Sequence, residues 1–268
     1  MPVISIIDPE DPARASAQGP HVAAAVMART LAMASGPLPI SEPRKRTRFE
    51  KPRARNPNQL TINQHVFPLK SIERFTDRTG RVSVRAVRRG SIIRAKPNNP
   101  MLCARRAWDE GTETGYMKRI EDAFQKSIDP IVAGTVSTLP AECKGIVDRA
   151  YALWYMRARF RSLESQEIHL NGLVGSDLTK EQEENLEKNG YMFARKNGAM
   201  PARQLNGIQL RMRVDDYART LAVGVTRWGV ITTQSGEFIV PDVPVHGVIP
   251  LTPRRALVHS APDGMITE

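Results

Sequence analysis

Cysteine, aromatic residues and long apolar runs are all scarce in this sequence. Its 268 residues include two cysteines, Cys103 and Cys143, and neither lies in a Cys-x-x-Cys or histidine-rich setting. This excludes a disulfide framework, and we expect both side chains to be reduced and buried. Aromatic residues make up 6% and hydrophobic residues 41% of the chain, which is enough for one sizeable folded domain.

No window holds the roughly eighteen uninterrupted apolar residues that a membrane-spanning helix needs. The nearest such window, residues 21–35, is interrupted by Arg29. It also follows Asp8, Glu10 and Asp11, where a signal peptide would carry positive charge. We therefore expect a cytoplasmic protein without a membrane partner.

Several catalytic motifs are absent as well. The sequence has no glycine-rich phosphate loop of the P-loop or Rossmann type and no Gly-x-Ser-x-Gly motif. It also lacks a His-x-x-x-His pair, an HNH-like motif and paired carboxylates at metal-ligand spacing. These absences argue against P-loop, Rossmann and α/β-hydrolase chemistry.

Positive charge, by contrast, is in excess. The charged fraction of 25% is ordinary, but the net charge is +11 and the isoelectric point is about 10. Such an imbalance favours association with polyanions, meaning nucleic acid or an anionic membrane surface, and DNA or RNA is the candidate partner. The alternative is a basic tail that only keeps the protein soluble.

The first 58 residues are rich in proline, alanine and arginine, and we predict a basic, largely disordered arm there. Residues 44–55 hold seven basic residues and one acid. Two interpretations stay open, a phosphate-contacting arm and a charged linker, and in both the folded body survives removal of residues 1–58. The candidate nucleic-acid-binding residues of this arm are Arg44, Lys45, Arg46, Arg48, Lys51, Arg53 and Arg55.

A second basic segment follows. Val82, Val84 and Val87 alternate with arginine, and Gly90 turns the chain into a second apolar run. The pattern predicts a β-hairpin over residues 81–95 with one arginine-rich face. Its candidate nucleic-acid-binding residues are Arg85, Arg88 and Arg89.

Apolar residues at spacings of three and four predict helices over residues 113–131, 141–161 and 201–221. Asp129-Pro130 marks the end of the first helix or a kink in it. The arginines at 157, 159 and 161 are explained by the negative end of the second helix dipole. Residues 179–190 are typical of a capped polar helix that is exposed and not part of the core.

Short β-patterned segments dominate after residue 227. The sequence therefore predicts an α+β fold, in which an antiparallel sheet from the early hairpin and the C-terminal strands is covered by several helices. We expect a single domain over residues 59–262 and a short tail over 263–268.

Two stretches also carry a family resemblance. QHVFPLKSIERF near residue 65, and FIVPDVPV followed by VIPLTPRRALV near the end, resemble a family known only as the domain-of-unknown-function family number 4238, over roughly residues 60–260. Its members open with His-His-x-x-Pro-x-x-Tyr-Leu-x-x-Phe and close with Thr-Ser-Asp-Asn-Pro-Val, then a strand and Pro-Leu-Ser-Pro. The fitting residues here are His65, Pro68, Ile72, Phe75, Asp242, Pro244, Val245, Pro250, Leu251 and Pro253.

The chain departs from that pattern at polar positions. Gln64 stands where the family has its first histidine, and Pro241 and Val243 replace the residues on either side of the aspartate. Ser71 replaces the tyrosine. If the family's paired polar groups are catalytic, the resemblance implies a divergent or inactive member.

His65 and Asp242 are the candidate catalytic pair. A carboxylate beside an imidazole is the arrangement that general acid–base catalysis requires. With Glu121 or Glu110 as a third ligand, the pair would bind a divalent metal for phosphodiester hydrolysis. The alternative is a buried His–Asp hydrogen bond that joins the first and last parts of the fold.

Two functions follow from these observations. One is a nucleic-acid-directed, nuclease-like hydrolase of a defence or toxin type, which needs a solvent-accessible imidazole at His65. The other is a non-catalytic basic protein that binds nucleic acid or a protein partner through its arm and hairpin.

Overall fold

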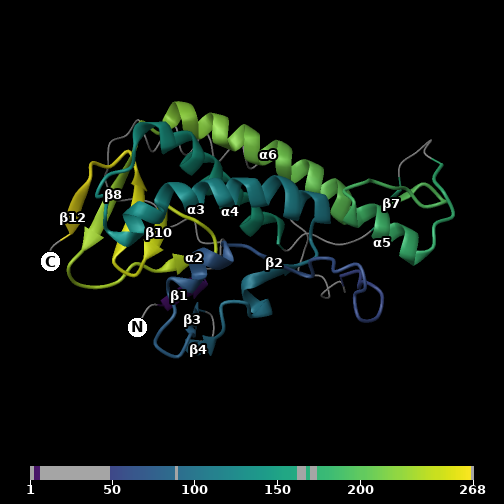
Figure 1. The fold of residues 1–268 in the computed structure, drawn as a ribbon, viewed down its shortest axis with the longest axis horizontal. Helices are drawn as coiled ribbons and strands as arrows, with labels where there is room; N and C mark the ends of the chain where they lie inside the picture. Colours follow the sequence, from purple (N-terminus) through teal and green to yellow (C-terminus); the bar gives the residue numbers. More distant parts are fainter. Residues whose placement is uncertain (1–2, 7–48, 88–89, 162–166, 170–173, 267–268) are drawn as a thin grey trace.

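The computed structural model describes residues 3–6, 49–87, 90–161, 167–169 and 174–266, and it confirms the predicted α+β class. Three long helices lie side by side, with one four-stranded sheet at one end of the molecule and a second sheet beneath the helices in the view of Figure 1. The three helices are α3 (Lys118–Ala133), α4 (Lys144–Phe160) and α6 (Ala202–Gly224).

The first predicted helix consists of two parts. A π-helix, Thr112–Met117, leads directly into α3. The helix does not end at Asp129-Pro130 but continues to Ala133, and Gly134 then adopts a left-handed conformation with φ 78°. Glycine accepts this backbone geometry without steric cost, so it terminates the helix.

Aromatic side chains from several elements join α4 to its neighbours. Trp154 of α4 packs against Phe67 with ring centroids 4.6 Å apart, and Tyr155 packs against Tyr217 of α6 at 5.0 Å. Tyr151 lies 5.6 Å from Trp228 of the C-terminal sheet. Because all of these rings are buried, α4 is the centre of the core.

The predicted hairpin is the outer part of the first sheet, whose strand order is β4-β3-β1-β9. β3 and β4 are antiparallel, whereas β1 runs parallel to both β3 and β9. The strands are β1 (Val3–Ile6), β3 (Val82–Ala86), β4 (Ser91–Ala95) and β9 (Val240–Pro241).

The other C-terminal strands form a second sheet of order β10-β11-β8-β12. The hairpin and most of the C-terminal strands therefore lie in different sheets. Within the described ranges, β9 is the one strand after residue 227 that belongs to the hairpin's sheet. Part of the expected tail, residues 264–266, pairs with β8. The strands are β8 (Trp228–Thr233), β10 (Val248–Thr252), β11 (Arg255–His259) and β12 (Gly264–Ile266).

Two further pairs of short strands flank the helices, and two short helices complete the fold. Both strand pairs are antiparallel. The pairs are β2 (Asn63–His65) with β5 (Cys103–Arg105), and β6 (Glu167–His169) with β7 (Ala199–Pro201). The short helices are α2 (Leu69–Glu73) and α5 (Lys180–Lys188), and two 3₁₀ turns, Pro100–Leu102 and Ala141–Cys143, precede β5 and α4.

The polar helix α5 begins as its sequence predicts. Thr179 and Gln182 form the reciprocal hydrogen bonds of a capping box. The expectation that this helix is exposed holds for Glu181, Gln182 and Asn185. It was wrong for the other face, because Glu183, Glu184 and Glu187 are all buried. Their carboxylates face cations from other parts of the chain, as described below, and this pairing makes their burial tolerable.

Candidate functional site

His65 lies at the end of β2, and the antiparallel register places it opposite Cys103 of β5. Its imidazole is half-buried, and the Nε2 atom lies 3.3 Å from the carbonyl oxygen of Pro97. Because a carbonyl oxygen only accepts hydrogen bonds, this contact requires the proton on Nε2.

The surroundings of His65 keep its ring neutral at pH 7. Burial lowers the pKa of His65, and the guanidinium of Arg157 lowers it as well. The Pro97 carbonyl and the carboxylates of Glu121 and Glu73 oppose this decrease without overcoming it. The neutral ring therefore keeps an unprotonated Nδ1 atom.

Asp242, the other half of the candidate pair, directly follows β9 and forms an ion pair with Arg161 at the end of α4. Arg161 also donates from Nη2 to the carbonyl oxygen of Met101 at 3.4 Å. Both motifs thus contact the segment 97–101, His65 at Pro97 and Asp242 by way of Arg161. No hydrogen bond links His65 to Asp242 in the part of the chain that the structure describes.

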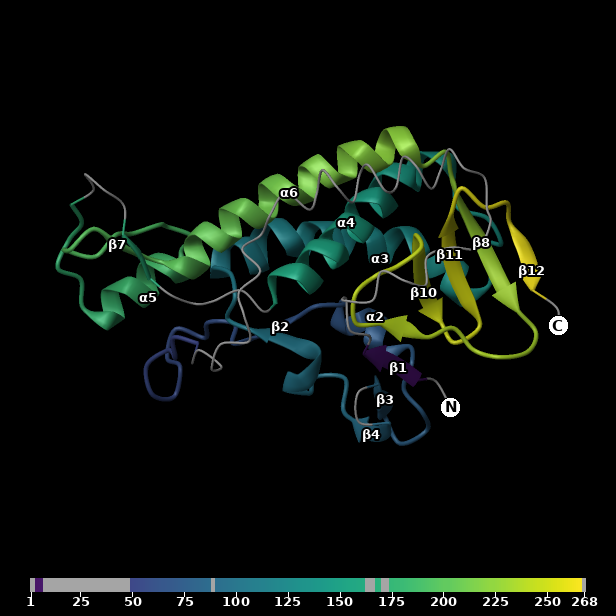
Figure 2. The same ribbon diagram turned by 180° about the vertical axis from the view of Figure 1, so that it is seen from behind.

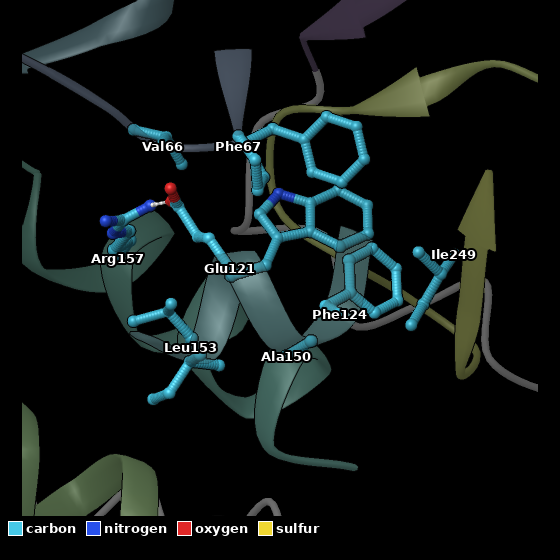
Figure 3. Close-up of a pocket in the computed structure, with 11 residues that line it drawn as sticks. Val66, Phe67, Glu121, Phe124, Ala150, Leu153, Arg157 and Ile249 are labelled. Carbon is cyan, nitrogen blue, oxygen red and sulfur yellow. Dashed lines mark hydrogen bonds and ion pairs between the residues drawn. The ribbon is translucent and has the colours of Figure 1, made fainter. Parts of the chain in front are cut away.

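Glu121, the predicted third ligand, is occupied by a buried arginine. Figure 3 shows its carboxylate pointing toward Arg157, which comes from the neighbouring helix α4. The Arg157 side chain is 1% exposed and also lies 3.4 Å from Glu113, whose carboxylate accepts a 2.6 Å hydrogen bond from the Trp108 indole. Burial alone would lower the pKa of Arg157, but Glu121 and Glu113 more than compensate and raise it.

The cavity beside this ion pair is too small for a substrate. It has a volume of about 10 Å³ and is lined mainly by apolar side chains, among them Phe67, Leu153 and Trp154. A single water molecule needs roughly this much space, whereas small-molecule sites measure roughly 300–1,000 Å³. We therefore regard the cluster of Arg157, Glu121 and Glu113 as part of the core and not as a substrate pocket.

The other proposed ligand, Glu110, is also paired. It is buried, accepts a 2.7 Å hydrogen bond from the Thr61 amide and lies 2.9 Å from the ammonium group of Lys188. Among the residues that the structure describes, no three histidine, cysteine, aspartate or glutamate side chains are grouped so that they could hold a metal ion. A metal centre built on His65 and Asp242 thus gains no support from the geometry.

Cys103 faces His65 across the strand pair but is not activated as a nucleophile. Burial raises the pKa of the Cys103 thiol to about 11. Because the thiolate is the reactive form, this thiol is inert at pH 7. Cys103 and Cys143 are both free, and Cys103 is buried as expected while Cys143 is half-buried.

Gln64, which the predicted resemblance aligns with the first histidine of that family, is fully buried. Its amide nitrogen donates to the Trp108 carbonyl at 2.8 Å, and its amide oxygen accepts from the Ala107 amide at 2.7 Å. Successive residues of a strand point to opposite faces, so Gln64 faces inward while His65 faces the Pro97 side. Two histidines at these positions would not share one face of β2.

The predicted hairpin and the residues around it carry several positively charged side chains without acidic partners. Residues 78–108 contain nine basic residues and no acid. Arg78, Arg81, Arg85 and Lys96 are exposed and form no side-chain hydrogen bond or ion pair with any residue of the described part. Arg94 is different, because it pairs with Asp77. We call Arg78, Arg81, Arg85 and Lys96 the basic hairpin surface. Arg105 of β5 is exposed as well, but its guanidinium lies 4.5 Å from the centre of the Phe49 ring.

The predicted arm residues divide into three groups. Arg44, Lys45, Arg46 and Arg48, like Arg88 and Arg89 of the hairpin, lie outside the described residues. Lys51 and Arg55 are exposed. Arg53 is instead part of the folded body, because its backbone amide donates to Glu184 at 2.6 Å and its side chain lies 3.1 Å from Glu181.

Sequence reasoning missed the ionic cluster that holds this segment. Glu187 accepts hydrogen bonds from Arg106 at 2.7 Å and from Arg203 at 2.7 and 2.9 Å, and all three side chains are buried. Glu50 pairs with Arg203, Lys180 and Arg195. We call this cluster the charged layer, and its members are Glu50, Arg53, Arg106, Lys180, Glu183, Glu184, Glu187, Arg195 and Arg203.

The charged layer changes what the arm is expected to do. Residues 49–58 are part of the body through Glu50, Arg53 and Asn58, the last of which donates to Glu184 at 3.2 Å. The strand β1 also lies inside a sheet. Removal of residues 1–58 would therefore leave buried charged residues of the charged layer without their partners. The prediction that the folded body survives this truncation is no longer supported. The sequence signal available was the run of glutamates at 181–187, which matches the arginines at 53, 106, 195 and 203.

Comparison with known proteins gives no further guide, since no family model, no curated protein and no solved structure matches this chain. The resemblance to family number 4238 therefore stays a prediction. No helix in the described ranges is both long enough and apolar enough to pass through a bilayer.

Proposed function

We propose that this protein binds nucleic acid through the basic hairpin surface and does not act as an enzyme there. The main support for this proposal is the segment 78–108, which contains nine cationic residues and no acidic residue. Four of its side chains, Arg78, Arg81, Arg85 and Lys96, are exposed and unpaired among the described residues. Unpaired cations on one surface attract the phosphate backbone irrespective of sequence.

The charge balance of the described residues supports the same proposal. They hold 31 of the 39 basic and 22 of the 28 acidic residues, a net charge of +9. The positive excess is therefore not confined to the segment outside them. Other arginines, such as Arg157 and Arg203, are instead paired with carboxylates inside the fold, so they are not available to a polyanion as the hairpin cations are. We include in this proposal the cytoplasmic location that the sequence predicts.

The proposal is tested by the salt dependence of binding. Fluorescence anisotropy would be recorded with labelled single-stranded DNA, duplex DNA and RNA over a salt titration. The test variant combines Arg81→Gln, Arg85→Gln and Lys96→Gln. Each lost phosphate contact should reduce the slope of log K against log salt by roughly 0.7–0.9. We expect affinity to fall at least tenfold and the slope to decrease by about two to three.

The matched control removes the same number of charges elsewhere. Arg219→Gln, Arg227→Gln and Arg254→Gln alter exposed residues on α6 and around the C-terminal sheet. This control should bind nearly as tightly as the unaltered protein. Equal losses of affinity in both triple variants would mean that binding depends on the net charge of the protein and not on the hairpin, which would contradict the proposal. Unchanged binding in the hairpin variant would refute it as well.

The nuclease-like hydrolase keeps one observation in its favour, the neutral imidazole of His65 with an unprotonated Nδ1. Such a ring is a competent general base at pH 7. If this function holds, His65→Ala abolishes hydrolysis of DNA or RNA measured with added Mg²⁺ or Mn²⁺ while nucleic-acid binding persists. Absence of hydrolysis by the unaltered protein on every strand type would leave binding as the function.

A further inference from the structure

A groove lies between α3 and α4, and the proposed function gives it no role. It measures about 630 Å³, within the roughly 300–1,000 Å³ of small-molecule sites. The two helices lie next to each other along the molecule (Figure 2). Tyr116, from the π-helix that precedes α3, closes one side. π-Helical turns often occur at functional positions, because the extra residue redirects the side chains around it.

The floor of the groove is apolar and its edge is charged. Ile120 and Ala123 of α3 and Ile146 of α4 form the floor. Gly145 leaves the backbone of α4 open there, because a β-carbon at this residue would meet no atom within 4 Å. A flat apolar group can therefore lie against α4 without displacing a side chain.

Two arginines on the edge are available to an anion. Arg119 is exposed and forms no hydrogen bond or ion pair with the described residues. Arg149 is only loosely held, at 3.4 Å from Asp215, with 54% of its side chain exposed. Asp215 already accepts a 2.8 Å hydrogen bond from the Tyr116 hydroxyl. Burial and the Asp215 carboxylate raise the pKa of Tyr116, so the phenol keeps its proton and stays with Asp215.

The groove also holds one acceptor. Glu142 lines it and forms no hydrogen bond or ion pair with the described residues. A carboxylate accepts hydrogen bonds and donates none. A ligand that suits the whole groove therefore needs an anionic group for the arginines, an apolar planar body for the floor, and an amino donor for Glu142.

We propose that the α3–α4 groove binds a nucleoside monophosphate whose base carries an exocyclic amino group. The phosphate pairs with Arg119 and Arg149, the base lies over Ile120 and Ile146 beside Gly145, and its amino group donates to Glu142. This site is separate from the basic hairpin surface, so it neither requires nor excludes nucleic-acid binding there.

Isothermal titration calorimetry on the full chain tests the proposal with four probes. AMP should bind. Adenosine lacks the phosphate, ribose 5-phosphate lacks the base, and IMP carries a carbonyl in place of the amino group. Each of the last three should bind at least about tenfold more weakly than AMP. No measurable binding of AMP at millimolar concentration, or IMP and AMP binding alike, would overturn the assignment.

Two pairs of variants locate the binding. Gly145→Leu places a bulky side chain where the base would lie, while Gly145→Ala makes the same backbone change and leaves that space open. Both replace glycine within a helix, so neither should lower the melting temperature. AMP binding should be lost in Gly145→Leu and retained in Gly145→Ala. The double variant Arg119→Gln and Arg149→Gln should weaken AMP at least tenfold, whereas the hairpin triple variant should bind AMP normally. Binding that survives Gly145→Leu would overturn the site.

Discussion

Arginine side chains in the charged layer and on the basic hairpin surface differ in what surrounds them. Arg106 and Arg203 have side chains that are 1% and 4% exposed and share the Glu187 carboxylate. Arg81 and Arg85 are exposed and have no acidic partner in the described ranges. In Figure 1 the two regions lie apart, the charged layer around α5 at the right end of the molecule and the hairpin strands β3 and β4 beneath the helices.

This difference separates two uses of the same residue type. A buried cation is tolerated only with a carboxylate beside it, since removal from water costs several kcal/mol per ion. An exposed cation keeps its hydration and contributes little to folding, but its field reaches a passing polyanion. The charged layer should therefore govern stability, and the hairpin should govern binding.

The largest effect is expected when the shared carboxylate of the charged layer is removed. Glu187→Gln would leave Arg106 and Arg203 buried without their common partner. We expect the free energy of unfolding to fall by about 3–5 kcal/mol, measured by urea denaturation. The control is Glu181→Gln, whose side chain is 60% exposed and pairs with Arg53. It should change stability by less than about 1 kcal/mol. Equal losses in the two variants would contradict the distinction between buried and exposed pairs.

A smaller effect is expected from pH through Glu50. Burial alone would raise its pKa, but Arg203, Lys180 and Arg195 outweigh burial and lower it from 4.5 to about 2. A carboxyl whose pKa is depressed on folding stabilises the protein above its unfolded pKa and loses that contribution as pH falls. The window is therefore from about pH 4.5 down to about pH 2.

The Glu50 contribution is expected to be about 1–2 kcal/mol, because the partly exposed side chain is screened by solvent. Urea denaturation at several pH values should show it as a stability loss that Glu50→Gln removes. A variant whose stability falls with pH as steeply as that of the unaltered protein would show that Glu50 is not the group responsible.

The smallest effect on stability is expected at the hairpin. The triple variant of Arg81, Arg85 and Lys96 should unfold within about 0.5 kcal/mol of the unaltered protein, although its nucleic-acid affinity falls at least tenfold. Both measurements on one sample sharpen the comparison. A stability loss as large as that of Glu187→Gln would mean that these cations have structural partners.

Much of the local structure could be predicted from the sequence. The three long helices, the hairpin, the capping box at Thr179 and the α+β class all follow from short-range periodicity and turn chemistry. These features depend on residues within a few positions of each other, so one sequence suffices to find them. The sequence also shows that acidic residues are scarce near the hairpin. The exposed side chains of Arg78, Arg81, Arg85 and Lys96, which have no acidic partner in the described part, agree with this.

Only the tertiary structure decided the roles of individual charges. His65 and Asp242 were expected to meet, yet each has another partner, Pro97 for the first and Arg161 for the second. Arg157 was explained by a helix dipole and is instead enclosed by Glu121 and Glu113. Each of these partners lies 32 or more residues away in sequence.

The polar helix α5 illustrates the physical reason. Its sequence alone is typical of a solvated helix, yet one face of it is buried because Arg53, Arg106, Arg195 and Arg203 come to that face from other segments. Local sequence determines which residues form a helix or strand and how much charge they carry. Whether a charge remains in water or is buried beside a counter-charge depends on long-range packing, which local pattern does not encode.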